Sequence, residues 1–230
     1  MTTVSLHRTG SFLSPWERPL LIWMAARLPA WLSPDGLTAI GFAGAAICAG
    51  GYALAPHTPW ALALASLGLI VNWFGDSLDG TLARVRRIER PRYGYFLDNS
   101  LDMLEQLLIA AGLACSGYVR SDVSFLALAV LLMMSSLSAL KACVAPLHQM
   151  AYGGFGLTEL RLAGLLANGA LFLFPPARVG GFGLPLTYPN IGLLAWSLAT
   201  LAMFVMSVWA DARQLAAEDR RAQGETADKP

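Results

Sequence analysis

The sequence predicts an all-α integral membrane protein in which six transmembrane helices follow an N-terminal amphipathic helix. Of its 230 residues, 56% are hydrophobic and 13% are charged, and this charged share is about half that of a typical soluble domain. The mean hydropathy is +0.53. These values exclude a disordered chain, a secreted disulfide scaffold and an ordinary cytosolic enzyme. The net charge of +1 gives no reason to expect a nucleic-acid partner.

Runs without charged residues locate the spans. Residues 36–75 contain no Asp, Glu, Lys or Arg, and since one span needs about 20 apolar residues, this run holds two. Pro56 and Pro59 mark the break between them. The six spans are predicted at 36–55, 60–84, 95–117, 122–143, 157–174 and 188–210. They form one domain over residues 1–213, and residues 214–230 form a polar cytoplasmic tail.

The basic residues predict the orientation. With six spans and a cytoplasmic N-terminus, fourteen of the sixteen Lys and Arg residues lie on the cytoplasmic side, and only Arg120 and Arg178 lie on the other. This asymmetry follows the positive-inside rule. We therefore expect a protein of the bacterial inner membrane with both termini in the cytoplasm.

The segment 14–32, before the first span, has a mixed composition. It places aromatic and charged side chains beside an apolar stripe: Trp16, Glu17, Arg18, Trp23, Arg27 and Trp31. Such a helix suits the headgroup layer of a membrane. A plain N-terminal anchor with no part in the chemistry would have the same composition, so both interpretations stay open.

The cysteines give no metal site. Cys48, Cys115 and Cys143 lie in apolar stretches, and their spacing fits no metal motif. We interpret them as small core residues.

Four aspartates stand at the facing ends of two consecutive predicted spans: Asp76, Asp79, Asp98 and Asp102. A charge in the membrane costs roughly 3 kcal/mol on insertion scales, so such residues usually serve a function. The first pair shares a helix face at i, i+3 and the second at i, i+4. A rise of about 1.5 Å per residue on either side of the turn at 88–92 places both pairs at similar depth, near the cytoplasmic surface. Crowded carboxylates repel and are stabilised by divalent cations, and a ligand set of oxygens favours Mg²⁺ or Mn²⁺.

Small and basic residues surround these acids. Gly80 and Ala83 follow Asp79, and Gly94 precedes Asp98 by four residues. A glycine inside a helix costs about 1 kcal/mol relative to alanine, which indicates that a ligand approaches the backbone closely. The arginines of residues 84–92 can bind phosphate. Together these features predict a metal-dependent site for a pyrophosphate compound, although helix capping, the positive-inside rule and helix packing would each explain one of them.

These two stretches resemble the signature of the CDP-alcohol phosphotransferases, also called CDP-alcohol phosphatidyltransferases. The signature is D-x-x-D-G-x-x-A-R, a spacer, and G-x-x-x-D-x-x-x-D. Residues 76–84 and 94–102 match it at every fixed position, with a spacer one residue longer than is common. The six-span plan also agrees, so the resemblance covers most of the chain.

The resemblance implies a phospholipid-synthesis enzyme, a transferase of substituted phosphate groups that uses two divalent metals, Mg²⁺ or Mn²⁺. It would move such a group from a CDP-alcohol to an acceptor hydroxyl and release CMP. By the resemblance, Asp76, Asp79 and Asp98 ligate metal, and Asp102 is both ligand and general base. If Asp102 is an ordinary ligand, Glu105, one turn further along the same helix, is the alternative base. The residues implied to bind the CDP-alcohol are Thr38, Asp79, Gly80, Ala83, Arg84 and Gly94. Asp35 stands where the family often has asparagine.

Two pairings of substrates stay open, and either includes a lipid. CDP-diacylglycerol can donate to a polar alcohol, or a CDP-headgroup can donate to a lipid hydroxyl. The segment 15–41 resembles choline and ethanolamine phosphotransferases, although Asn99 stands where those enzymes often have histidine. Conversely, four basic residues are candidates for binding a phosphorylated acceptor: Arg86, Arg92, Lys141 and Arg161. The chain is compatible with a homodimer.

Two other classes of membrane protein share part of this pattern. A Mg²⁺-dependent prenyltransferase also binds pyrophosphate, but it would normally need more spans and a second, separate acidic motif. A divalent-cation transporter would place its acids near the middle of the membrane, whereas these lie at span ends. Release of CMP from a CDP-alcohol distinguishes the three classes.

Overall fold

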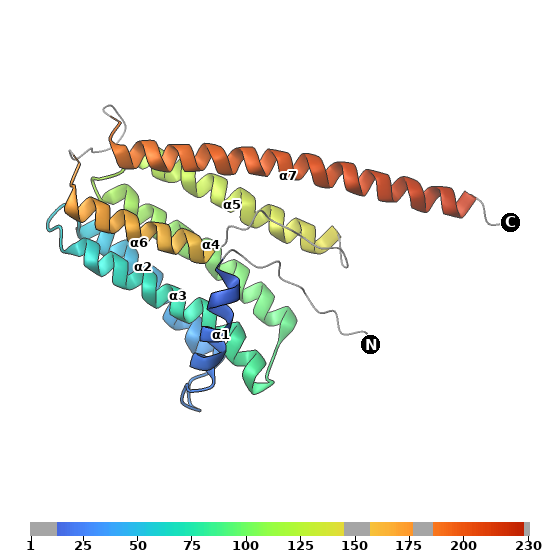
Figure 1. The fold of residues 1–230 in the computed structure, drawn as a ribbon, viewed down its shortest axis with the longest axis horizontal. Coiled ribbons are helices and arrows are strands. Elements are labelled where there is room, and N and C mark those ends of the chain that lie inside the picture. The colour runs from blue at the N-terminus through green and yellow to red at the C-terminus, as the bar shows by residue number, and fades with distance from the viewer. Residues whose placement is uncertain (1–12, 145–156, 177–185, 228–230) are drawn as a thin grey trace.

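The computed structural model describes residues 13–144, 157–176 and 186–227, and within these ranges all regular structure is helical (Figure 1). The helices are α1 Ser14–Ala25, α2 Pro34–Leu54, α3 Ala61–Arg86, α4 Pro91–Cys115, α5 Ser121–Val144, α6 Leu157–Leu173 and α7 Tyr188–Ala227. Helices α2 to α7 run along one common direction, and α1 lies across them (Figure 1). Arg178, which the topology places on the outer side, lies outside the described residues.

A helix lies at each of the six predicted spans. Among the described residues, α2, α3, α5 and α7 are long and apolar enough to cross a membrane. Helix α4 carries three acids, Asp98, Asp102 and Glu105, and α6 has only 17 residues. The all-helical membrane class is therefore confirmed, and spanning by α4 and α6 remains a prediction.

The predicted breaks occur where the prolines stand. Helix α2 ends at Leu54 and α3 begins at Ala61, on either side of Pro56 and Pro59. Helix α3 ends at Arg86, the next residue Arg87 has a left-handed φ of 57°, and the Ile88 amide donates to the Ala83 carbonyl at 3.0 Å. This arrangement closes the helix end. Pro91 then begins α4, where its missing N–H costs nothing.

Helices α2 and α3 pack backbone against backbone through glycines. A Cβ added to Gly75 would lie 2.3 Å from the Gly41 nitrogen and 2.4 Å from the Leu37 carbonyl oxygen. A Cβ on Gly44 would lie 2.3 Å from the Asn72 nitrogen. Small residues allow this approach in membrane bundles. Because Gly75 directly precedes Asp76, the contact also fixes the position of that carboxylate.

Gly75→Ala is expected to destabilise the protein by about 1–3 kcal/mol, because the added methyl overpacks the glycine seam, the close contact of α2 and α3 at Gly41, Gly44 and Gly75. The control is Gly50→Ala on α2, where an added Cβ meets nothing within 4 Å. Thermal unfolding in detergent should separate the two variants, with Gly50→Ala at or above the wild-type midpoint. Equal midpoints for both would contradict the close packing at Gly75.

Helix α1 presents one face to the bundle and another to its surroundings. Leu21 and Ala25 are buried against α3 in a cluster that includes Leu78. Trp16 and Trp23, on the opposite face, are 82% and 55% exposed. The helix thus covers the stretch of α3 that carries the aspartates.

Two sequence interpretations need correction or extension. Cys48 is buried, but Cys115 and Cys143 are exposed, so the assignment of all three to the core is wrong. In a chain with few charged residues the surface is apolar as well, and apolar neighbours do not indicate depth. The polar tail after residue 213 continues α7 as far as Ala227.

Candidate active site

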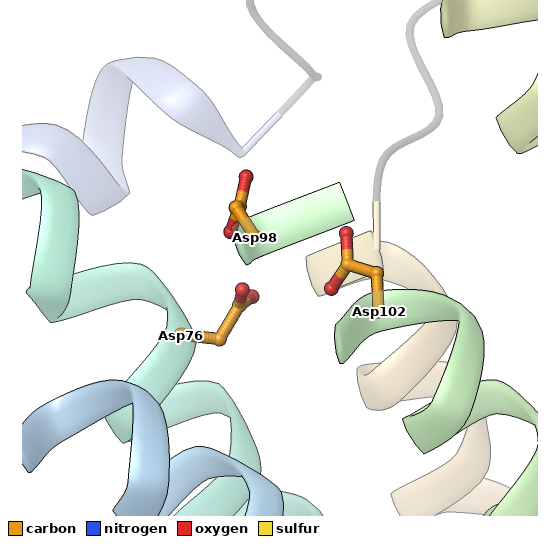
Figure 2. A group of neighbouring side chains, drawn as sticks. All are labelled: Asp76, Asp98 and Asp102. Atoms are coloured by element: carbon orange, nitrogen blue, oxygen red, sulfur yellow. The ribbon is translucent and has the colours of Figure 1, made fainter. Parts of the chain in front are cut away.

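Three aspartates from two helices meet in one cluster. Asp76 on α3 and Asp98 and Asp102 on α4 each offer a carboxylate oxygen, and these oxygens lie within 4.8 Å of one another. Figure 2 shows the three side chains pointing towards a shared space. All three are half-buried, which strengthens their mutual repulsion. Such a cluster of oxygens is suited to a divalent cation.

Asp79, the fourth predicted ligand, lies one turn away and is held by α2. Thr38 Oγ1 donates to Asp79 Oδ2 at 2.6 Å, and the Gly80 amide donates to Asp79 Oδ1. Among the described residues the close cluster therefore comprises three aspartates, with Asp79 beside it. The same bond brings together Thr38 and Asp79, two residues that the resemblance assigns to the CDP-alcohol.

A buried polar network continues from the cluster into the bundle. Arg161 Nη1 donates to Asp76 Oδ2 at 2.7 Å, and its Nε donates to Asn72 Oδ1 at 2.7 Å. Asn72 Nδ2 in turn donates to Glu105 Oε2 at 2.7 Å and to the Gly41 carbonyl at 3.0 Å. Asn72 and Glu105 are 1% and 6% exposed. Arg161 therefore offsets part of the negative charge of the aspartate cluster. The Glu105 carboxylate is held by its hydrogen bond from Asn72.

The glycines of the predicted nucleotide site are not required for packing. A Cβ on Gly80 would meet only the Arg84 guanidinium, at 3.5 Å, and a Cβ on Gly94 would meet nothing within 4 Å. This contrasts with Gly75, where backbone atoms leave no room. Helix packing therefore does not explain Gly80 and Gly94, and the open space beside them leaves room for a ligand to approach the backbone. Ala83, between them in sequence, is half-buried on α3.

The other predicted basic residues are spread over several helices. Arg86 donates to backbone carbonyls of the segment between α1 and α2, including Pro29 at 2.8 Å and Leu28 at 3.1 Å. Lys141 on α5 donates to Ser207 Oγ at 3.0 Å and forms an ion pair with Asp211, both on α7. Arg92 is exposed in the first turn of α4. Of the four candidates for acceptor binding, Arg161 is the one bonded to the aspartate cluster.

Two further contacts lie near the end of α3 and in the turn that follows it. Arg84 Nη2 donates to Thr81 Oγ1 at 3.1 Å. Asp35 forms an ion pair with Arg90, in the turn between α3 and α4. The hydrogen bond to Asp35 raises the pKa of the Arg90 guanidinium. The aspartate that replaces the usual asparagine thus links the start of α2 to this turn.

The sequence pattern did not predict the contacts of Asn72 and Glu17. Asn72 lies four residues before Asp76, on the same face of α3, so its spacing was a usable signal. Glu17 on α1 accepts hydrogen bonds from Trp73 and Thr158, on α3 and α6. No periodicity within one helix indicates such a contact between three helices.

Comparisons with known proteins agree with the signature. The sequence model of the family described as CDP-alcohol phosphatidyltransferase matches residues 31–209. Cholinephosphotransferase 1 of Gallus gallus is 30% identical over 110 residues, which cover 44% of this chain and 32% of that protein.

Two archaeal proteins are also similar. Archaetidylinositol phosphate synthase of Pyrococcus horikoshii is 37% identical over 97 residues, 42% of this chain and 48% of that protein. The protein of the same name from Methanothermobacter thermautotrophicus is 36% identical over 108 residues, 47% of this chain and 52% of its own. The matches thus span a third to about half of the length of these three relatives.

Proposed function

This chain belongs to the CDP-alcohol phosphatidyltransferase family, and we propose that it transfers a substituted phosphate group from a CDP-alcohol to an acceptor hydroxyl in phospholipid synthesis, with release of CMP. The observation that carries the proposal is the meeting of Asp76, Asp98 and Asp102 beside a stretch of α3 and α4 whose glycines leave open space. The names of the relatives, a cholinephosphotransferase and two archaetidylinositol phosphate synthases, support the same reaction class.

The donor set fits a divalent metal. Three carboxylates within 4.8 Å, with one guanidinium among them, carry an excess of negative charge that a cation offsets. We assign Asp76, Asp98 and Asp102 to Mg²⁺ or Mn²⁺, and Asp79, one turn away, to a second ion. When bound, such ions polarise the diphosphate of the donor and stabilise the charge that develops on departing CMP.

The protein residues then have separable roles. Thr38, Gly80, Ala83, Arg84 and Gly94 border the CDP moiety, and Gly80 and Gly94 leave its phosphates close to the backbone. Asp102 accepts the proton of the acceptor hydroxyl. The oxygen of that hydroxyl bonds to the β-phosphorus as the bond from this phosphorus to CMP breaks. Arg161, held by Asp76 and Asn72, supplies positive charge on the acceptor side.

The reaction class and the substrate pair are tested by one assay. Purified protein with Mg²⁺ or Mn²⁺ is supplied with CDP-diacylglycerol, CDP-choline or CDP-ethanolamine, each with polar alcohols, their phosphates and diacylglycerol. CMP release that depends on one acceptor is expected. Release of pyrophosphate from a prenyl donor, or metal uptake into liposomes without CMP release, would contradict the proposal.

We further propose that six helices span a bacterial inner membrane, with the site and both termini in the cytoplasm. Helices at all six predicted positions support this, as does the excess of basic residues on one side. A thiol reagent applied from outside should label cysteines introduced at Thr58, which is exposed in the turn between α2 and α3, or at Arg120, in a background without the native cysteines. Labelling at Arg90 from outside would contradict the six-span topology.

A further inference from the structure

Helix α1 contacts α3 and α6 through one carboxylate oxygen of Glu17. Glu17 Oε1 accepts a hydrogen bond from Trp73 Nε1 at 2.6 Å and from Thr158 Oγ1 at 3.0 Å, and Ser77 Oγ lies at 3.5 Å. These donors belong to α3 and α6, whereas Glu17 belongs to α1. We propose that Glu17 is a positioning residue that holds α3 and α6 at the spacing at which Arg161 meets Asp76.

The donors to Glu17 stand close to the ion pair of Arg161 with Asp76. Trp73 lies one turn before Asp76, and Thr158 lies one turn before Arg161. The ion pair of Arg161 with Asp76, at 2.7 Å, therefore joins the same two helices that Glu17 joins. Because α3 and α6 run in opposite directions (Figure 1), Trp73 and Thr158 lie on either side of this ion pair. Glu17 and Arg161 are thus separate connections between the two helices, and together they fix the separation and relative rotation. Loss of the Glu17 connection leaves the bonds of Arg161 to Asp76 and Asn72 to hold the helices at this level.

A second contact keeps α1 in register with α6. The Leu13 amide donates to Glu159 Oε1 at 3.1 Å, next to Thr158. On the same face of α1 as Glu17, Leu21 and Ala25 are buried against α3. Helix α1 is thus seated by apolar packing, and Glu17 adds a polar contact to both α3 and α6. This assigns the N-terminal helix a part in the chemistry beyond that of an anchor.

The inference rests on the proposed function for its kinetic readout, so the test also includes metal binding. The variants are Glu17→Ala, Glu17→Gln, Thr158→Val and the double variant Glu17→Ala/Thr158→Val, with Glu218→Ala as control. Glu218 is an exposed acid on α7 that accepts from Gln214 at 2.9 Å. Each variant is measured for CMP release, for KM of donor and acceptor, and for Mn²⁺ affinity by calorimetry.

Glu17→Ala should lower kcat by about 10–10²-fold with little change in donor KM, since a small misplacement of reacting groups has that cost. It should also weaken Mn²⁺ binding several-fold. Glu17→Gln should keep most of the wild-type kcat and Mn²⁺ affinity, because the amide oxygen of glutamine still accepts hydrogen bonds from Trp73 and Thr158. The double variant should be no worse than Glu17→Ala, since the Thr158 hydroxyl has already lost its acceptor.

Three results would overturn the inference: wild-type kcat and Mn²⁺ affinity in Glu17→Ala, a Glu17→Gln as defective as Glu17→Ala, or losses that add in the double variant. If Glu17→Ala unfolds, Thr158→Val serves as the test, because valine has nearly the same shape as threonine and removes only the hydroxyl that donates to Glu17. An unchanged kcat and Mn²⁺ affinity in Thr158→Val would then overturn the positioning role of Glu17. If wild-type protein releases no CMP from any donor, the proposed function fails, and the Mn²⁺ titrations still decide the role of Glu17.

Discussion

Asp76→Asn is expected to lower the rate of CMP release by at least about 10²–10³-fold, the cost of removing one group that stabilises developing charge. Asp76 belongs to the three-carboxylate cluster and also accepts a hydrogen bond from Arg161. The amide oxygen can still accept from Arg161, so the protein should fold. Asp98→Asn should have a similar effect, because it removes a second charge from the same cluster. CMP release and Mn²⁺ affinity are measured on each variant.

The matched control is Asp122→Asn. Asp122 stands at the start of α5, where it accepts from Arg120 Nε at 3.0 Å, and it lies outside the aspartate cluster. Its loss should leave both CMP release and Mn²⁺ affinity near the wild-type values. Near-wild-type turnover in Asp76→Asn or Asp98→Asn would refute the assignment of that residue to the metal.

Asp102→Asn is expected to separate proton transfer from metal binding. If Asp102 is the general base, turnover should fall by about 10²–10⁴-fold, while the donor stays bound through Thr38, Asp79 and the open face at Gly80. Mn²⁺ affinity should fall less than in Asp98→Asn. Donor binding is followed by calorimetry with Mn²⁺, and CMP release is measured under saturating substrates.

Glu105→Gln is the comparison for that experiment. Glu105 is 6% exposed and accepts from Asn72, and glutamine can keep this bond, so a modest effect is expected. Equal loss of donor binding in Asp98→Asn and Asp102→Asn would make Asp102 an ordinary ligand. A loss in Glu105→Gln as large as in Asp102→Asn would assign the base to Glu105.

The sequence predicted those features that depend on local pattern. Charge-free runs and prolines located the helices and their breaks, because membrane length and proline geometry act within one segment. The i, i+4 spacing of Asp98 and Asp102, with the turn at Pro91, correctly placed both beside Asp76. These inferences needed no knowledge of how distant segments pack.

Features that depend on contacts between distant helices could not be predicted. Asp79 points to Thr38 because glycines bring α2 and α3 together, and no count along α3 alone gives that result. The sequence indicates Arg161 only as a basic residue at the start of a span, and its bond to Asp76 comes from the packing of α6 on α3. Glu17 lies 141 residues from Thr158, beyond the reach of any periodicity.

The glycine seam between α2 and α3 also limits how substrates can enter and leave. Sliding of packed helices depends on side chains that exchange rotamers between them, and at Gly44 and Gly75 the facing atoms are backbone. Thr38, Asp76 and Asp79 therefore move as one rigid body. Helix α4 is seated on α2 in the same way, since a Cβ on Gly112 would lie 2.5 Å from the Ala49 Cα. Helix α6 differs, because a Cβ on its Gly164 would meet a side-chain atom of Leu69, at 3.1 Å. If the proposed transfer takes place at this site, the widening that admits a substrate or releases CMP is expected from α6, and substitutions on its outer face would alter turnover without touching a reacting group.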